Sequence, residues 1–188
     1  MRIHWLILIW AFISTAVHAN PIHGAAGWIR DSVLLMPDSL RTRVLAAIAR
    51  GDIAGAVSLW ELETGRNAPH WLQGFQAAFN AVNQRAGPCI QVARSVYEGF
   101  KQLGASPTYI QFTTAIVRRG DNLIGFELRA GEPRSTVNIS VNAVHYVVRV
   151  GDRLYDAMTG PAGLTTAEYM QRLQSPGRLS MQTLSQLP

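Results

Sequence analysis

Gly87-Pro88-Cys89 opens the segment that decides the fold, CIQVARSVYEGFKQLG at residues 89–104. Proline is favoured in the first turn of a helix because its missing N–H would have no partner there. Gly104 is a typical C-terminal stop. Apolar residues recur between them at the spacing of one helical face, at Cys89, Ala93, Val96, Phe100 and Leu103. The pattern predicts a helix that carries the only cysteine of the chain in its first turn, on the side that faces the core.

The chain before this helix is predicted to consist of short helices. Apolar residues recur with helical spacing in four segments, near residues 27–36, 38–51, 52–64 and 70–83. Asp38 and Asp52 are the predicted N-caps of the second and third segments, because an aspartate side chain accepts hydrogen bonds from the free N–H groups of a first turn. We expect residues 20–86 to form a helical accessory region.

After the cysteine helix, the hydrophobic period changes from 3.6 to 2, which is typical of strands. Turn signals lie at residues 120–122 and 151–152, and a short helix capped by Thr165 is predicted up to Leu173. The polar tail from Gln174 is predicted to be loose. The predicted strands are Tyr109–Val117, Leu123–Leu128, Val137–Val150 and Arg153–Ala157. The fold class is therefore predicted to be α+β, with one helix packed on an antiparallel sheet of about four strands.

The first 19 residues are predicted to be a secretory signal peptide. Met1-Arg2 is a basic start, residues 5–13 are strongly apolar, and Val17-His18-Ala19 has the small or aliphatic residues that a signal peptidase reads. We therefore expect a secreted or periplasmic protein with no stable membrane span after cleavage. The full chain of 188 residues is 48% hydrophobic and 15% charged, a composition typical of a globular protein. We expect the 169 residues after the signal peptide to be globular.

Sixteen of the 17 basic residues are arginines, and they are scattered along the chain. No basic stripe interleaved with aromatic residues is present, so nucleic-acid binding is not expected. One cysteine and three histidines after residue 19 show no metal-ligand spacing, and no phosphate loop or dinucleotide fingerprint occurs. We therefore expect no metal and no cofactor. A lone cysteine in an oxidising compartment is either at risk of unwanted oxidation or has a function as a free thiol.

A cysteine nucleophile needs a base, and the base needs an orienting group. His145 lies within a predicted strand, and Gly151-Asp152 is a predicted two-residue hairpin turn. This turn pairs Val150 with Arg153, which makes Asp156 the diagonal neighbour of His145 on the same face of the sheet. A register shifted by one residue would move Asp156 to the other face. The spacing predicts that Cys89, His145 and Asp156 form a catalytic triad, against the alternative of a satisfied core histidine.

The order of these three residues resembles that of the papain-like cysteine peptidase superfamily. The stretch VHYVVRVGDRLYD at residues 144–156 is similar to the papain-fold toxin domains of bacterial polymorphic and effector toxins. The resemblance covers about residues 87–170, less than half of the chain. We expect residues 87–173 to form the papain-like catalytic domain and residues 174–188 to be a tail. It implies Cys89 as nucleophile, His145 as general base and acid, and Asp156 as its orienter. The oxyanion donor that the family often places before the cysteine would be Gln84 or Asn83, which lie five and six residues before it.

The function that this implies is a secreted thiol hydrolase, a protease or deamidase, acting as a toxin or effector on a protein and possessing an immunity or inhibitor partner. One alternative is a cell-wall peptidase of the NlpC/P60 kind acting on peptidoglycan. Such domains typically have an Asp-Cys pair, whereas Pro88 precedes the cysteine here. Another alternative is an acyltransferase that uses the same triad. A non-catalytic secreted binding protein is the last, and exposed side chains among Trp28, Trp60 and Trp71 would support it.

Overall fold

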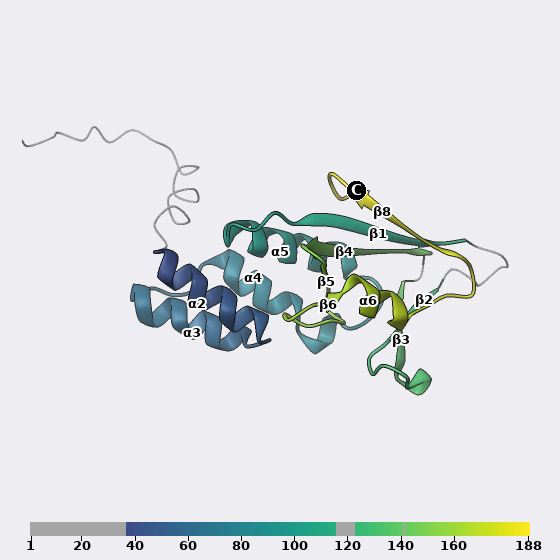
Figure 1. The fold of residues 1–188 in the computed structure, drawn as a ribbon, viewed down its shortest axis with the longest axis horizontal. Helices are drawn as coiled ribbons and strands as arrows, with labels where there is room; N and C mark the ends of the chain where they lie inside the picture. The colour runs from purple at the N-terminus through teal and green to yellow at the C-terminus, as the bar shows by residue number, and fades with distance from the viewer. Residues whose placement is uncertain (1–36, 116–122, 141) are drawn as a thin grey trace, which may run out of the picture. The chain divides into compact units, whose positions relative to one another are not determined.

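The structure is a computed structural model that describes residues 37–115, 123–140 and 142–188 (Figure 1). The signal peptide and the helix expected near residues 27–36 lie outside the described residues. The described residues belong to one compact unit. Its first part contains helices α2 (Asp38–Ala49), α3 (Ile53–Thr64), α4 (His70–Ala78) and α5 (Cys89–Gln102), with a 3-10 turn, η1 (Ala81–Asn83), between the last two.

The second part contains two antiparallel sheets, so the predicted α+β class is confirmed. The five-stranded sheet has the order β6-β5-β4-β1-β8, and the three-stranded sheet has the order β3-β2-β7. A 3-10 turn η2 precedes β3, and helix α6 lies between β6 and β7. The bounds are β1 Thr108–Thr114, β2 Ile124–Glu127, η2 Pro133–Ser135, β3 Thr136–Ser140, β4 Val144–Val150, β5 Arg153–Tyr155, β6 Leu164–Thr165, α6 Thr166–Arg172, β7 Leu173–Gln174 and β8 Leu179–Leu184.

The predicted caps of the first helices differ in outcome. Asp52 is the N-cap of α3, and its side chain accepts a hydrogen bond of 2.8 Å from the backbone N–H of Gly55. The cap predicted at Asp38 is wrong, because Pro37 is the N-cap of α2 and the chain is already helical at Asp38. The Asp38 carboxylate instead pairs with Arg41 one turn further on.

Helix α4 ends at Ala78, five residues before the predicted end. The Asn83 side chain folds back, and its Nδ2 donates to the carbonyl oxygens of Ala77 at 2.9 Å and Ala78 at 3.3 Å. The last carbonyls of a helix have no intrahelical partner. Asn83 satisfies two of them, and the chain turns away through η1.

The β4–β5 hairpin has the predicted register. Val150 pairs with Arg153, and Val148 pairs with Tyr155. Gly151, the first residue of the two-residue turn, has φ of 61°. Such a left-handed conformation gives a hairpin turn the twist of its strands. This register fixes which residues beyond Tyr155 return toward His145.

The other strands depart from the prediction in three ways. The single strand predicted over Val137–Val150 is wrong, because β3 ends at Ser140 and the chain turns before β4 at Ala143, which has φ of 64°. The segments called β1 and β2 belong to different sheets and do not pair. The loose tail is also wrong: β8 pairs with β1 from Tyr109 to Thr114 as an edge strand. An edge strand is held by backbone hydrogen bonds, so its polar composition does not prevent pairing.

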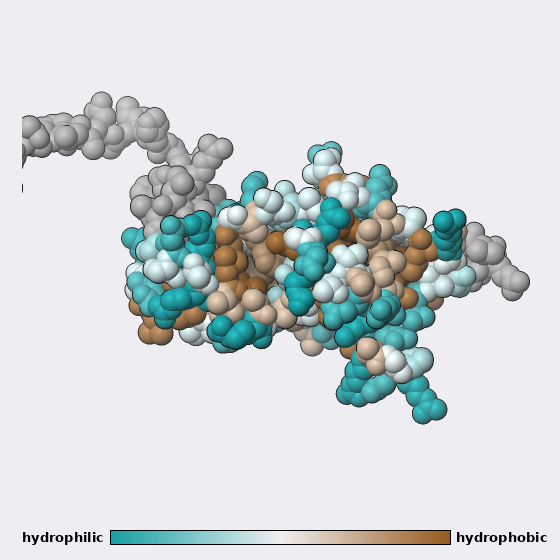
Figure 2. Space-filling view, viewed as in Figure 1, coloured by the Kyte–Doolittle hydropathy of each residue, from teal (hydrophilic) through white to brown (hydrophobic). Residues whose placement is uncertain are grey.

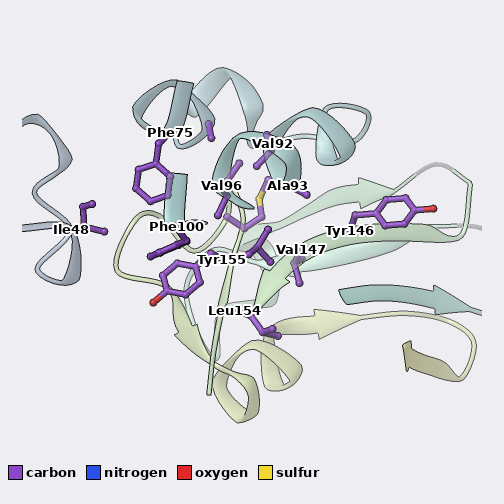
Figure 3. Close-up of a cluster of buried hydrophobic side chains, with 14 of the residues drawn as sticks. Ile48, Phe75, Val92, Ala93, Val96, Phe100, Tyr146, Val147, Leu154 and Tyr155 are labelled. Carbon is purple, nitrogen blue, oxygen red and sulfur yellow. The ribbon is translucent and has the colours of Figure 1, made fainter. Parts of the chain in front are cut away.

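One hydrophobic core joins the helices to the five-stranded sheet (Figure 3). Helix α5 lies between α4 and strand β4 and contacts both. The Phe100 ring on α5 lies 5.1 Å from that of Phe75 on α4 and 4.5 Å from that of Tyr155 on β5. The helical segment before residue 86 therefore shares its core with the sheet. In the view of Figure 1, the surface has hydrophilic residues around smaller apolar areas (Figure 2).

No helix among the described residues is long and apolar enough to span a bilayer.

Gly99 permits the close approach of α4 and α5. A Cβ atom at this position would lie 2.3 Å from Cδ2 and 2.9 Å from Cβ of Phe75. We expect Gly99→Ala to lower the free energy of unfolding by about 1–3 kcal/mol. The cost of pushing the two helices apart exceeds the gain in helix propensity from alanine. Gly74→Ala on α4 is the matched control, since its nearest atom would be Ser95 Oγ at 3.9 Å. Urea denaturation should find this control at least as stable as the parent; equal effects of the two substitutions would contradict the packing argument.

Candidate active site

Cys89 is the first residue of α5, as predicted, with Pro88 at the N-cap position. Its thiol is partly buried. The backbone N–H groups of Tyr146 and Ile90 lie near the sulfur and lower the pKa of the thiol. Because α5 packs on β4, the start of the helix lies against the strand that carries His145. The positive end of the helix dipole and these two amides favour a thiolate at this place.

His145 and Asp156 form a buried pair. The Nε2 atom of His145 lies 2.9 Å from Oδ2 of Asp156, and the two residues are 3% and 1% exposed. The diagonal neighbourhood predicted from the hairpin register is thus present, although β5 ends one residue before Asp156. Since Nε2 is bonded to Asp156, Nδ1 is the ring nitrogen left for the thiol; it is buried and makes no hydrogen bond of ordinary geometry with a described residue.

The structure brings all three predicted residues to one cavity. Cys89, His145 and Asp156 line a cavity of about 10 Å³, which has room for about one water-sized group. The remaining lining residues are Asn83, Arg85, Val92, Ala157 and Met158. Arg85 was not expected from the sequence, because nothing in its spacing from Cys89 distinguishes it from the other scattered arginines.

The electrostatics favour a charged pair of Cys89 and His145. Burial raises the pKa of the Cys89 thiol, but the neighbouring imidazole of His145 and its charge outweigh this effect, and the net pKa lies below the ordinary value of 9.0. Burial lowers the pKa of His145, yet its hydrogen bond to Asp156 and the nearby negative charge of Asp156 and Cys89 outweigh this effect and raise the pKa to about 9. Each group therefore stabilises the charged form of the other. Near neutral pH the site can hold a thiolate beside an imidazolium.

The Asp156 carboxylate accepts hydrogen bonds from other donors besides His145. Its Oδ1 accepts from the backbone N–H groups of Met158 at 2.8 Å and Thr159 at 3.0 Å. Its Oδ2 also accepts from the Tyr169 hydroxyl at 2.6 Å. Tyr169 was missed by the sequence analysis, which predicted its helix but assigned no role to its side chain. The one available signal is that a buried tyrosine hydroxyl usually has a partner, and spacing does not identify which.

The two predicted oxyanion residues lie near the site but are differently engaged. Both amide hydrogens of Asn83 are directed at the end of α4, so its side chain has a structural task. Gln84 donates through Nε2 to the carbonyl oxygen of Ala157 at 3.1 Å, next to Asp156. An amide nitrogen carries two hydrogens. Gln84 therefore retains one donor, although it does not line the cavity.

Within the described ranges, no group of three or more His, Cys, Asp or Glu residues could hold a metal ion. Comparison of the chain with protein-family models, with curated proteins and with solved structures yields no match.

Proposed function

We propose that this protein is a papain-like cysteine hydrolase that acts on an amide bond of a protein, as a protease or a deamidase. The observation that supports the proposal is the buried series of a helix-opening thiol, an imidazole and a carboxylate around one cavity. A nucleophile, a base and a group that orients the base are the parts that such a reaction requires.

In the proposed reaction the Cys89 thiolate attacks the carbonyl carbon, and a C–S bond forms. The N–H of Cys89 in the first turn has no intrahelical partner and can donate to the oxyanion, as can the remaining hydrogen of Gln84. The imidazolium of His145 gives its proton to the leaving amine, or to the leaving ammonia in deamidation, as the C–N bond breaks. His145 then takes a proton from the water that attacks the thioester. The C–S bond breaks, the carboxylic acid is released, and the Cys89 thiolate is restored beside the His145 imidazolium.

Secretion through residues 1–19 and a toxin or effector role belong to the same proposal, as does a partner protein that inhibits the site. Secretion is supported by the sequence of the N-terminus, and the toxin role and the partner follow from the resemblance of residues 144–156 to papain-fold toxin domains. The substrate is proposed to be protein and not nucleic acid.

No structural observation favours the alternative of a binding protein whose tryptophans form a contact surface. Trp60 is only 7% exposed, and its ring centroid lies 6.0 Å from that of Trp71 in an edge-to-face contact. Trp71 is itself partly buried in the core. Trp28 lies outside the described residues. The large apolar side chains that are exposed in the described part of the chain, Leu62, Val82, Met170 and Met181, belong to different elements.

The proposal is tested by incubating residues 20–188 with a mixture of unfolded proteins and, separately, with purified peptidoglycan. Mass spectrometry of the proteins should find either new chain ends or conversion of glutamine to glutamate. Cys89→Ala should abolish the product, whereas Lys101→Ala, at the far end of the same helix, should not. Product that persists in Cys89→Ala would refute the proposal. Release of peptidoglycan fragments alone would instead assign the cell-wall peptidase, and transfer to an added amine or acyl acceptor would assign the acyltransferase.

A further inference from the structure

The Tyr169 side chain is fully buried, and its surroundings are aromatic. Its ring stacks on Phe112 at a centroid distance of 5.5 Å and lies 5.0 Å from Phe126. A phenylalanine would fill this space equally well. The hydroxyl is therefore not explained by packing, and its contact is the hydrogen bond of 2.6 Å to Oδ2 of Asp156.

The hydroxyl completes the set of donors around the carboxylate. Oδ1 receives two backbone N–H groups, from Met158 and Thr159, while Oδ2 receives His145 Nε2 and the Tyr169 hydroxyl. An ionised carboxylate has about four acceptor sites, so all of them are used. Without Tyr169, the oxygen that faces His145 would be held by His145 alone.

The position of Tyr169 is set by the same hairpin that brings His145 and Asp156 together. Helix α6 begins with a capping box, in which Thr165 Oγ1 accepts from the N–H of Glu168 at 3.2 Å and Glu168 Oε2 accepts from the N–H of Thr165 at 2.8 Å. The N–H of Thr166 donates to the carbonyl of Asp152 in the β4–β5 turn at 2.9 Å. The turn therefore anchors α6, and α6 aims Tyr169 at the carboxylate.

We propose that Tyr169 is a positioning residue of this site, whose hydroxyl holds the Asp156 carboxylate in the orientation that keeps His145 directed at Cys89. This inference rests on the proposed function. Its effect on the imidazole follows from the shared oxygen. When one of the two donors to Oδ2 is removed, the negative charge of this oxygen interacts more strongly with the remaining donor, which is His145.

Loss of the hydroxyl should therefore have two consequences. The imidazolium should keep its proton to higher pH, and the less firmly held carboxylate should orient the imidazole less well. The titratable and charged groups that face His145 are Cys89 from α5, Asp156 after β5 and Arg85 in the same cavity, with Tyr169 acting through Asp156. A Tyr169→Phe substitution leaves the first three unchanged.

The test measures the rate of Cys89 alkylation by iodoacetate against pH in the protein from residue 20 onward. The imidazolium attracts this anionic reagent, so the rate falls at high pH when His145 loses its proton. For Tyr169→Phe we expect a plateau about three- to tenfold lower, in line with the loss of one hydrogen bond, and a descending limb shifted to higher pH. Tyr155→Phe is the matched control, because Tyr155 is a buried tyrosine, 8% exposed, that packs on Phe100 and makes no hydrogen bond to Asp156. Its profile should coincide with that of the parent.

A profile of Tyr169→Phe that coincides with the parent's would overturn the inference and leave Tyr169 as a core residue. A purely structural role predicts equal loss of thermal stability in both tyrosine variants and no shift of the limb. If the parent itself has no limb that depends on His145, the proposed function fails together with the inference. A parent limb that is present but insensitive to Tyr169 overturns the positioning role alone.

Discussion

Replacing His145 with alanine is expected to lower the rate of Cys89 alkylation at pH 6 by about tenfold or more. Without the imidazolium, burial raises the pKa of the thiol above its ordinary value, so only a small fraction of the thiol is ionised at pH 6. A thiolate of higher pKa is intrinsically more nucleophilic, which recovers part of this loss. The rates of the two proteins should converge as the pH approaches about 9, where His145 itself loses its proton.

His70→Ala is the control for this measurement. His70 is an exposed residue at the start of α4 and, with His145, accounts for the histidines of the described residues. Its removal should leave the profile unchanged. His145→Gln keeps more of the side-chain volume than His145→Ala. It therefore separates the effect of losing the imidazole from the effect of creating a cavity. Cys89 that reacts in the native parent only at the rate of an ordinary thiol would show that no thiolate–imidazolium pair forms.

The central features of the site could be predicted because they depend on local rules. The apolar spacing of residues 89–104 fixed the helix and placed Cys89 at its start. A two-residue turn at Gly151-Asp152 allows essentially one register, and that register carries Asp156 to His145. Similarly, Thr165 and Glu168 form a capping box whose spacing is visible in the sequence.

The features that were missed depend on contacts between distant segments. Pairing of β8 with β1 is made by backbone groups, so the side chains around Met181 show no strand pattern. The break between β3 and β4 requires Ala143 in the left-handed conformation, which few non-glycine residues adopt. The role of Tyr169 depends on how α6 packs against the hairpin. Chain order alone contains none of this information.

Asp156→Ala is expected to lower the free energy of unfolding by about 3–5 kcal/mol, the usual effect of removing one partner of a buried ion pair. The substitution leaves the imidazole of His145, the hydroxyl of Tyr169 and the amides of Met158 and Thr159 without their acceptor. Asp52→Ala removes a carboxylate that caps α3 at an exposed position, and it should cost less. Urea denaturation of each variant in the Cys89→Ala background, where no thiol titrates, gives the comparison.

The dependence of this penalty on pH distinguishes a charged site from a well-packed neutral one. The pKa of His145 is raised in the folded protein to about 9 from an ordinary 6.5. Its contribution to stability is therefore fully present below about pH 6.5 and is lost as the pH rises toward the folded value, which is lower when Cys89 is absent. The stability difference between the Cys89→Ala protein and its Asp156→Ala derivative should be largest near pH 6 and should shrink by pH 9.5, while the Asp52→Ala difference stays constant. A penalty for Asp156→Ala that is the same at both pH values would mean that Asp156 does not stabilise an imidazolium at His145, contrary to the role proposed for this carboxylate.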